Sequence, residues 1–203
     1  HRFQHYYAWF FYGLMTLIWV TFKDFVALSK YHKSGLLKRM GTSRNELMFR
    51  IILAKVLYYP IVVGLPLAFS GLGAGQVIAG WLLMHFVGGL TLGLVFQPAH
   101  VMEDHDYRPA EKGLVIEDDP MSHQLKTTCN FGTKSRLLNW YSGGLTHQIE
   151  HHLFPHICHV HYSDISPIVR KTAEEFGLPY RADTSFWGAL KLHTAQLRQL
   201  GRA

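Results

Sequence analysis

The sequence predicts an all-α integral membrane helical bundle, a transmembrane hairpin plus an interfacial helix, with a cytosolic helical cap that is rich in histidine. Three observations predict this architecture. Two long apolar runs follow one another in the first half of the chain, a basic loop precedes them, and nine of the 14 histidines fall between residues 100 and 161. Charged residues make up 17% of the 203 residues, against about 25% in an ordinary soluble domain.

The predicted hairpin consists of Ile51 to Phe69, with Lys55 as its one charged residue, and Val77 to Phe96, with none. At about 1.5 Å rise per residue, each run reaches roughly 30 Å, the thickness of a bilayer's hydrocarbon core. Proline and glycine interrupt the runs, which membrane helices tolerate better than soluble helices do. The alternative is a pair of buried helices in a soluble core, but so long an uncharged run is hard to bury in a small domain.

A third apolar run, Tyr6 to Phe22, is short and rich in aromatic residues, which suit the headgroup boundary of a membrane. We expect it to lie along the interface or to cross only part of the bilayer. The segment Lys23 to Arg50 carries seven Lys and Arg against two acidic residues, so the positive-inside rule places it in the cytoplasm. One crossing out and one back make the protein multi-pass and return the chain to the cytoplasm, so everything from about Gln97 onward is predicted to be cytosolic.

Two further helices are predicted in the C-terminal tail. Pro167 suits the first position of a helix that Gly177 ends. A second helix begins after a cap within residues 183–185 and ends at Gly201. Its basic face suits either an anionic membrane surface or the solvated side of a packed helix. Its predicted apolar face consists of Phe186, Leu190, Leu197 and Leu200, and its basic face of Lys191, Arg198 and Arg202.

The strongest chemical signal is the segment THQIEHHLFPH. If it is helical, Gln148, His151 and His152 occupy positions i, i+3 and i+4 and share one face. Neutral imidazoles that converge from one face are ligands that suit a borderline transition metal. Glu150 lies off that face and could accept a hydrogen bond that orients a histidine, with His147 in a structural or similar supporting role. The alternative is a set of polar histidines that holds no metal.

His100 lies in FQPAHVMEDHDY, about one turn beyond the second membrane run, where a side chain can reach a site at the membrane face. Metal ligation is favoured for it over a structural hydrogen bond. Glu103 is a weaker candidate, and nothing indicates which way His105 and Asp106 point. His85 lies inside the membrane run, and for it a hydrogen bond between packed helices is favoured over a functional role. The other histidines of the cluster, expected to be structural or supporting, are His123, His156, His159 and His161.

The chain resembles the membrane fatty acid desaturases, in particular the front-end acyl desaturases of the delta-6 or linoleoyl-CoA type. The segments that carry the likeness are QIEHHLFP, FQPAHVMED, HQLKTTCNF and TAEEFGLPY, and HRFQHYYAWFFYG at the start fits the same pattern. Front-end enzymes characteristically have Gln where other desaturases have the first His of an HxxHH box. The resemblance implies that Gln148, His151 and His152 form the third histidine box, with Gln148 as the weakest ligand. It also implies His100 as an extra ligand of two non-haem irons over a buried acyl tunnel.

The likeness covers residues 1–203 as the C-terminal part of one desaturase domain. The family's first two boxes, of HxxxH and HxxHH form, are expected upstream. His1 and His5 do give an HxxxH string, but it heads the aromatic run and resembles a later segment of the family. Because three histidines cannot hold two irons, we expect this polypeptide alone to have an incomplete site.

Desaturation removes two hydrogens from methylene carbons that no side chain is basic enough to deprotonate. An iron centre that activates O2 can abstract such hydrogens, so the difficult chemistry belongs to the cofactor. The protein then supplies ligands, a tunnel that fixes which carbon meets the metal, and access for electrons. A net charge of +6 suits a fatty acyl-CoA or acyl-lipid headgroup and an acidic electron donor such as cytochrome b5 or ferredoxin. No nucleic-acid partner is indicated.

Three other functions remain open from the residues. A related membrane di-iron hydroxylase, conjugase or epoxidase would share the ligand scaffold and differ in its product. A non-catalytic membrane protein could bind haem or zinc through its histidines, and it would hold one metal per chain. A membrane scaffold would hold none, so counting metals separates these last two from the enzymes.

Overall fold

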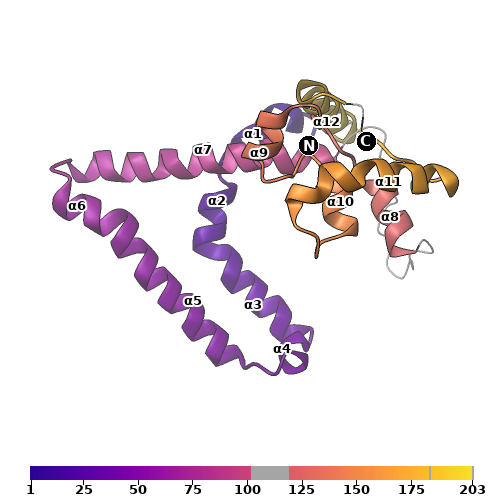
Figure 1. Cartoon of the computed structure of the whole chain (residues 1–203). Coiled ribbons are helices and arrows are strands. Elements are labelled where there is room, and N and C mark those ends of the chain that lie inside the picture. Colours follow the sequence, from indigo (N-terminus) through magenta and orange to yellow (C-terminus); the bar gives the residue numbers. More distant parts are fainter. Residues whose placement is uncertain (102–118, 183, 203) are drawn as a thin grey trace. The chain divides into compact units, whose positions relative to one another are not determined.

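The computed structural model describes residues 1–101, 119–182 and 184–202, and these residues form helices and loops without a named strand (Figure 1). This confirms the predicted all-α class. The chain divides into two compact units. One unit consists of residues 8–93, and the other of residues 1–7 together with the chain from Leu94 onward.

The unit of residues 8–93 contains the apolar helices. Its elements in chain order are α1 (Gln4–Gly13), α2 (Met15–Ile18), the π-helical turn η1 (Trp19–Lys23), α3 (Asp24–Lys33), α4 (Leu36–Arg39), α5 (Arg44–Tyr59), the π-helical turn η2 (Pro60–Gly64), α6 (Leu65–Phe69) and α7 (Ala74–His100). The first residues of α1 and the last turns of α7 belong to the other unit.

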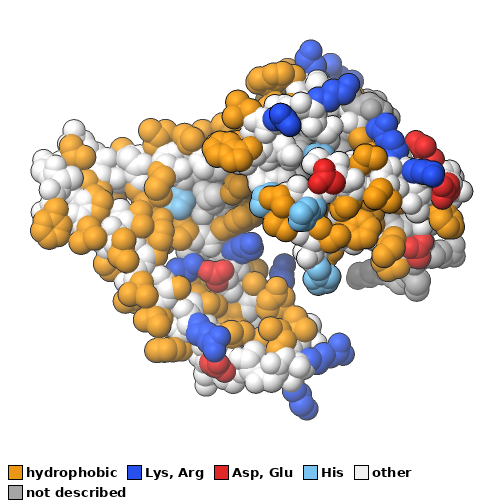
Figure 2. All heavy atoms as spheres, in the orientation of Figure 1, with side chains coloured by type: hydrophobic (Ala, Val, Ile, Leu, Met, Phe, Trp, Pro, Cys, Tyr) orange, Lys and Arg blue, Asp and Glu red, His pale blue; other side chains and the backbone are white. Residues whose placement is uncertain are grey.

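Two helices are long and apolar enough to cross a membrane. Arg44–Phe69, which joins α5, η2 and α6, has 26 residues, and α7 has 27. They contain the two predicted apolar runs, 51–69 and 77–96. The aromatic run forms a helix pair, Gln4–Gly13 and Met15–Lys33, that is bent by 52° and counts as a third span if the pair crosses as one. Figure 2 shows apolar side chains over α5 to α7 and basic side chains gathered near α4.

Proline in the first apolar helix widens the helix instead of ending it. Pro60 has no N–H to donate to the carbonyl four residues earlier, and the π-helical turn η2 begins at this residue. At the other end, Ser43 caps α5, because its hydroxyl accepts a hydrogen bond from the Glu46 N–H at 3.1 Å. The helix that begins at Arg44 thus continues past Pro60 to Phe69, and its geometry is π-helical only in the turn η2.

His85 joins three helices of this unit through hydrogen bonds. Its Nε2 lies 2.6 Å from the Tyr58 hydroxyl on α5, and its Nδ1 lies 3.2 Å from the Thr16 hydroxyl on α2. The Trp81 indole N–H donates to the same Tyr58 oxygen at 3.0 Å. The favoured interpretation of His85, a hydrogen bond between packed helices, is confirmed.

Glycines let α1 and α7 approach each other closely. A Cβ added at Gly89 would lie 2.5 Å from the Gly13 carbonyl oxygen and 2.7 Å from that of Tyr12. A Cβ at Gly93 would lie 2.7 Å from the Tyr12 Cβ. Small residues at such a contact let two backbones pack directly, which is the usual source of helix association in membranes.

The other unit contains the end of α7 and all the helices that follow it. These are α8 (Pro120–Thr127), α9 (Arg136–Tyr141), α10 (Gln148–Leu153), the 3-10 turn η3 (His159–His161), α11 (Tyr162–Glu175) and α12 (Phe186–Leu200). Two small apolar clusters form its core: Val95, Ala99, Cys129, Phe131 and Ala189 in one, and Leu125, Ile149, Val169 and Ala173 in the other. The first cluster includes Val95 and Ala99 at the end of α7, and the second includes Ile149 of α10.

The two tail helices are confirmed, with one wrong start. Helix α11 begins at Tyr162 and not at Pro167, which lies inside it, because the turn η3 leads directly into the helix. Gly177, with φ of +67°, follows its end as predicted. Ser185 caps α12, and on its apolar face Leu190 is buried and Phe186 packs against the first cluster, whereas Leu200 is exposed.

Candidate metal-binding site

The end of α7, which carries His100 as its last residue, is held by hydrogen bonds from two distant segments. The Cys129 N–H donates to the Ala99 carbonyl at 3.2 Å. On α12, the fully buried His193 has its Nδ1 2.8 Å from the Val101 carbonyl, so that nitrogen carries the proton and donates. His100 is therefore placed between two fixed residues, Ala99 and Val101.

The segment QIEHHL forms the helix α10, as predicted. Its first residues are almost fully buried. The Gln148 amide donates to the Leu145 carbonyl at 3.0 Å, while its buried Oε1 has no hydrogen-bond partner among the described residues. Because a buried acceptor without a partner is costly, Gln148 Oε1 is an atom that a metal or a further donor would satisfy.

His152 faces His100. Their Nε2 atoms lie 3.3 Å apart, and their rings meet edge to face with centroids at 4.9 Å. Burial, together with the neighbouring His100 and His151, lowers the pKa of His152 to about 4. His152 is therefore neutral at pH 7 and keeps the lone pair that a metal ligand needs.

His151 points to a different partner. Its Nδ1 lies 3.4 Å from the Tyr162 hydroxyl, and its ring centroid lies 5.4 Å from that of His152. Burial raises the pKa of Tyr162, which keeps the phenol protonated. In the tautomer whose Nδ1–H donates to the Tyr162 oxygen, the bond fixes the ring orientation and Nε2 keeps its lone pair, the arrangement common for metal-binding histidines.

The spacing of these nitrogens fits a shared metal in part. Two imidazole nitrogens that bind one ion at about 2.1 Å, with an angle near that of a tetrahedral or octahedral site, lie roughly 3.0–3.4 Å apart. The observed 3.3 Å between His100 and His152 falls in this range. Within residues 1–101, 119–182 and 184–202, however, no three His, Cys, Asp or Glu side chains form a group that could hold a metal ion. The described residues thus provide two converging nitrogens, one from His100 and one from His152. Gln148 and His151 lie on α10, the helix that also carries His152.

Two of the predicted supporting residues are buried beside this pair. The Glu150 carboxylate is fully buried and accepts hydrogen bonds from the Asn130 amide at 2.7 Å and the Tyr180 hydroxyl at 2.6 Å. His147 is also buried, which lowers its pKa, and its Nδ1 lies 3.1 Å from the Thr146 hydroxyl. Glu150 lies on α10 with the histidines, and its described hydrogen bonds run to Asn130 and Tyr180 and not to a histidine.

Three residues of this region were not predicted from the sequence. Asn130, Tyr180 and His193 are the partners that hold α10 and the end of α7. Asn130 lies in HQLKTTCNF and Tyr180 in TAEEFGLPY, two segments that carry the family resemblance. This resemblance was the one sequence signal that could have pointed to them. The predicted weaker candidates Glu103, His105 and Asp106 lie outside the described residues.

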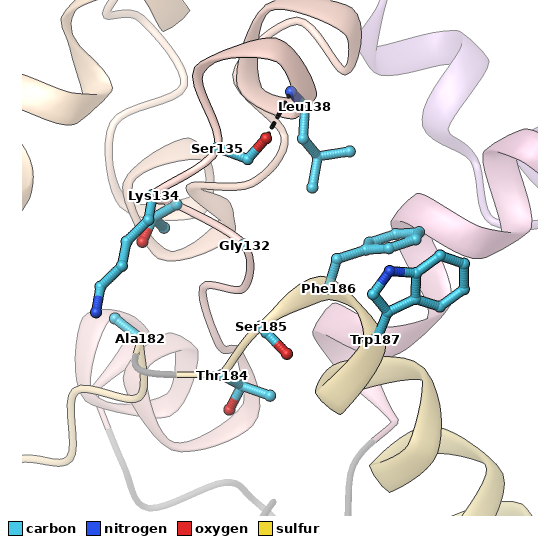
Figure 3. A pocket seen from close by; sticks show the side chains of 10 residues that line it. Gly132, Lys134, Ser135, Leu138, Ala182, Thr184, Ser185, Phe186 and Trp187 are labelled. Carbon is cyan, nitrogen blue, oxygen red and sulfur yellow. Dashed lines mark hydrogen bonds between the residues drawn. The ribbon is translucent and has the colours of Figure 1, made fainter.

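A separate pocket of about 450 Å³ lies between the starts of α9 and α12 (Figure 3). Ser135 and Ser185, which cap these two helices, form part of its wall beside Lys134 and Trp187. Their hydroxyls accept hydrogen bonds from the first helical turns. None of the candidate ligands lines this pocket, so it is distinct from the histidine group.

The chain is similar to proteins that are named as desaturases. It is 36% identical over 202 residues to an acyl-lipid (8-3)-desaturase of Physcomitrium patens, covering 99% of this chain and 41% of that protein. It is 31% identical over 206 residues to an sn-1 linoleoyl-lipid 6-desaturase of Synechocystis sp., covering 100% of this chain and 56% of that protein. A Delta(5) fatty acid desaturase A of Dictyostelium discoideum is 33% identical over 206 residues, which cover 99% and 43%.

The chain therefore spans about half the length of the curated relatives that it matches. No solved structure matches it. The family model described as fatty acid desaturase matches residues 1–184, which is most of the chain. By this match and by the relatives above, the chain belongs to the fatty acid desaturase family.

Proposed function

We propose that the protein introduces a double bond into a fatty acyl chain in an O2-dependent reaction at a histidine-ligated centre of two non-haem irons. The observation that carries the proposal is the pair of Nε2 atoms of His100 and His152, 3.3 Å apart at the end of an apolar helix. Membership of the desaturase family gives this pair its chemical interpretation.

The proposed roles follow from the contacts. His100 and His152 hold iron through Nε2, His151 does so with its Nδ1 bonded to Tyr162, and the partnerless Oε1 of Gln148 is a weaker ligand. The irons, when bound, supply the O2 activation and hydrogen abstraction that no side chain can perform. The low pKa of His152 keeps its ring neutral, so a proton does not compete for the ligand position at pH 7.

The substrate class is proposed from the relatives and the helices. Two of the relatives are named for acyl-lipid or linoleoyl-lipid substrates, which favours a lipid-linked acyl chain over an acyl-CoA for this protein. Helices long enough to cross a membrane give such a chain an apolar surface. We place the site on the cytoplasmic side, because the basic segment 23–50 precedes the hairpin. Cytochrome b5 or ferredoxin is the proposed electron donor, an acidic partner for a chain of net charge +6.

The test compares His152→Ala with His156→Ala, a matched change at an exposed histidine four residues away. The protein is expressed from its own gene in a host whose lipids lack the product, and fatty acids are measured by gas chromatography. Iron per chain is measured on the purified protein. We expect wild type and His156→Ala to form the same new unsaturated acids and to retain iron, and His152→Ala to lose both.

Each other outcome excludes a stated function. Hydroxylated or conjugated products in the wild type would identify one of the related di-iron enzymes. One zinc or one haem per chain, without new fatty acids, would identify a binding protein. Equal iron and equal product in the two variants would remove His152 from the site.

A further inference from the structure

We propose that Asn130 is a positioning residue that sets the spacing between His100 and His152, with Glu150 and Tyr180 completing a buried clamp on α10. The expected effect on iron binding rests on the proposed function. The clamp consists of contacts within the protein, so it can be tested in protein that holds no metal.

The segment around Asn130 is fixed to the helix that carries His100. The N–H of Cys129 donates to the carbonyl of Ala99, the residue before His100. The Cys129 thiol also lies 3.7 Å from the Pro98 carbonyl. Cys129 and Ala99 are fully buried in one apolar cluster, so water does not compete for the backbone bond. Through its neighbour Cys129, Asn130 is therefore attached to Ala99, the residue directly before His100.

The side chain of Asn130 is fixed to the helix that carries His152. Its Oδ1 accepts a hydrogen bond from the Ile149 N–H at 2.8 Å, in the first turn of α10, where the helix has no internal acceptor for that group. Its Nδ2 donates to the Glu150 carboxylate at 2.7 Å and to the Tyr180 hydroxyl at 3.0 Å. Asn130 is fully buried and uses both its donor and its acceptor atoms. It thus fixes the position and the rotation of α10.

Tyr180 closes the clamp from the other side of Glu150. Its hydroxyl donates to Glu150 Oε1 at 2.6 Å, and the Ser166 hydroxyl, 2.6 Å away, then donates to Tyr180. Burial and the nearby carboxylate raise the pKa of Tyr180, so it stays a donor. Ser166 lies on α11, so the clamp links the start of α10 to a second helix.

The choice of residues favours a positioning role over stability alone. Glu150 is fully buried, and its described hydrogen bonds come from the neutral groups of Asn130 and Tyr180. Burying a carboxylate among neutral donors is costly, and an apolar side chain of similar size would usually pack there at lower cost.

The experiment reverses the donor and the acceptor between two side chains. Asn130→Asp keeps the shape and the acceptor for Ile149 but places an oxygen against the Glu150 carboxylate. Adding Glu150→Gln restores a donor in that contact and keeps an acceptor for Tyr180. Asn45→Asp makes the same chemical change at an exposed position and serves as the control. Hydrogen exchange of the α10 amides is measured in metal-free protein, and iron retention against a chelator is measured separately.

We expect Asn130→Asp to speed exchange in α10 by at least tenfold and to lower iron retention by about 10–100-fold, as for other partners of metal ligands. The double variant is expected to recover most of both losses, and Asn45→Asp to match wild type. Unchanged exchange in Asn130→Asp, or no recovery in the double variant, would overturn the clamp. If Asn130→Asp does not fold, Tyr180→Phe must still speed exchange in α10 more than in α12, and equal effects in both helices would overturn it.

The two proposals fail separately. A wild-type protein that never retains iron, but whose α10 exchange responds as described, would overturn the proposed function and leave the clamp standing. A wild type that retains iron and forms product, but whose α10 exchange does not respond to Asn130→Asp, would overturn the clamp and leave the proposed function standing.

Discussion

Replacing Gly89 by alanine should separate α1 from α7, and Gly88→Ala on the same helix provides the control. A Cβ at position 89 would lie 2.5 Å from the Gly13 carbonyl oxygen, and the atoms it meets are backbone atoms that cannot rotate away. A Cβ at position 88 would meet nothing within 4 Å. Ordinary contact begins at about 3.4 Å, so Gly89→Ala must move the two backbones apart by roughly 0.9 Å.

A gap of this size has a calculable cost. Separation by 0.5–1 Å forfeits about a quarter to a half of each dispersion contact along the interface. Overpacking in a close contact typically costs about 1–3 kcal/mol, and a backbone clash lies at the upper end of that range. Alanine also gains up to about 1 kcal/mol of helix propensity over glycine, but both variants share this gain. The difference between Gly89→Ala and Gly88→Ala should therefore be about 2–3 kcal/mol in unfolding free energy.

The assay is thermal unfolding in lipid nanodiscs, followed by far-ultraviolet circular dichroism. For a chain of this length, about 2–3 kcal/mol corresponds to a fall in Tm of roughly 4–12 °C for Gly89→Ala relative to Gly88→Ala. Two variants that melt within about 1 °C of each other would refute the close approach of α1 and α7.

Three further changes test other contacts. Tyr58→Phe removes the hydroxyl shared by His85 and Trp81 and should lower the unfolding free energy by about 1 kcal/mol in nanodiscs, whereas Tyr59→Phe should not. Ser185→Ala removes the cap of α12 and should cost about 1 kcal/mol in a thermal melt; an unchanged Tm would exclude a role for the cap. Burial lowers the pKa of His193, so the unfolded chain binds its proton more readily below about pH 6.5, and stability falls on acidification. His193→Gln should lose less stability than wild type between pH 7 and pH 5.5, in the metal-free protein.

The helices could be predicted because their signals are local. Long apolar runs correctly predicted two helices that are long enough to cross a membrane, and Gly177 and Ser185 correctly marked a helix end and a helix start. The start at Pro167 was wrong, because a proline inside a helix and a proline at its first position have the same local sequence when the preceding turn is unknown.

The candidate site was predictable only as a set of residue types. The spacing in QIEHH placed the three side chains on a helix, but it could not say that His152 faces His100 while His151 faces Tyr162. Apart from the family resemblance of its segment, the sequence around Asn130 does not indicate its partners, which lie 19, 20 and 50 residues away. Long-range contacts of this kind depend on tertiary packing, which periodicity does not report.

The segment from Cys129 to Gly132 has a consequence for how the chain is made. Its four backbone N–H groups donate to Ala99, Arg181, Thr146 and Thr184, partners on both sides of it in the sequence. Contacts between residues so far apart form slowly, because a long loop must close before any of them is gained. The four bonds therefore cannot all form until residue 184 has left the ribosome, and the segment is fully held only after the start of α12 has been synthesised.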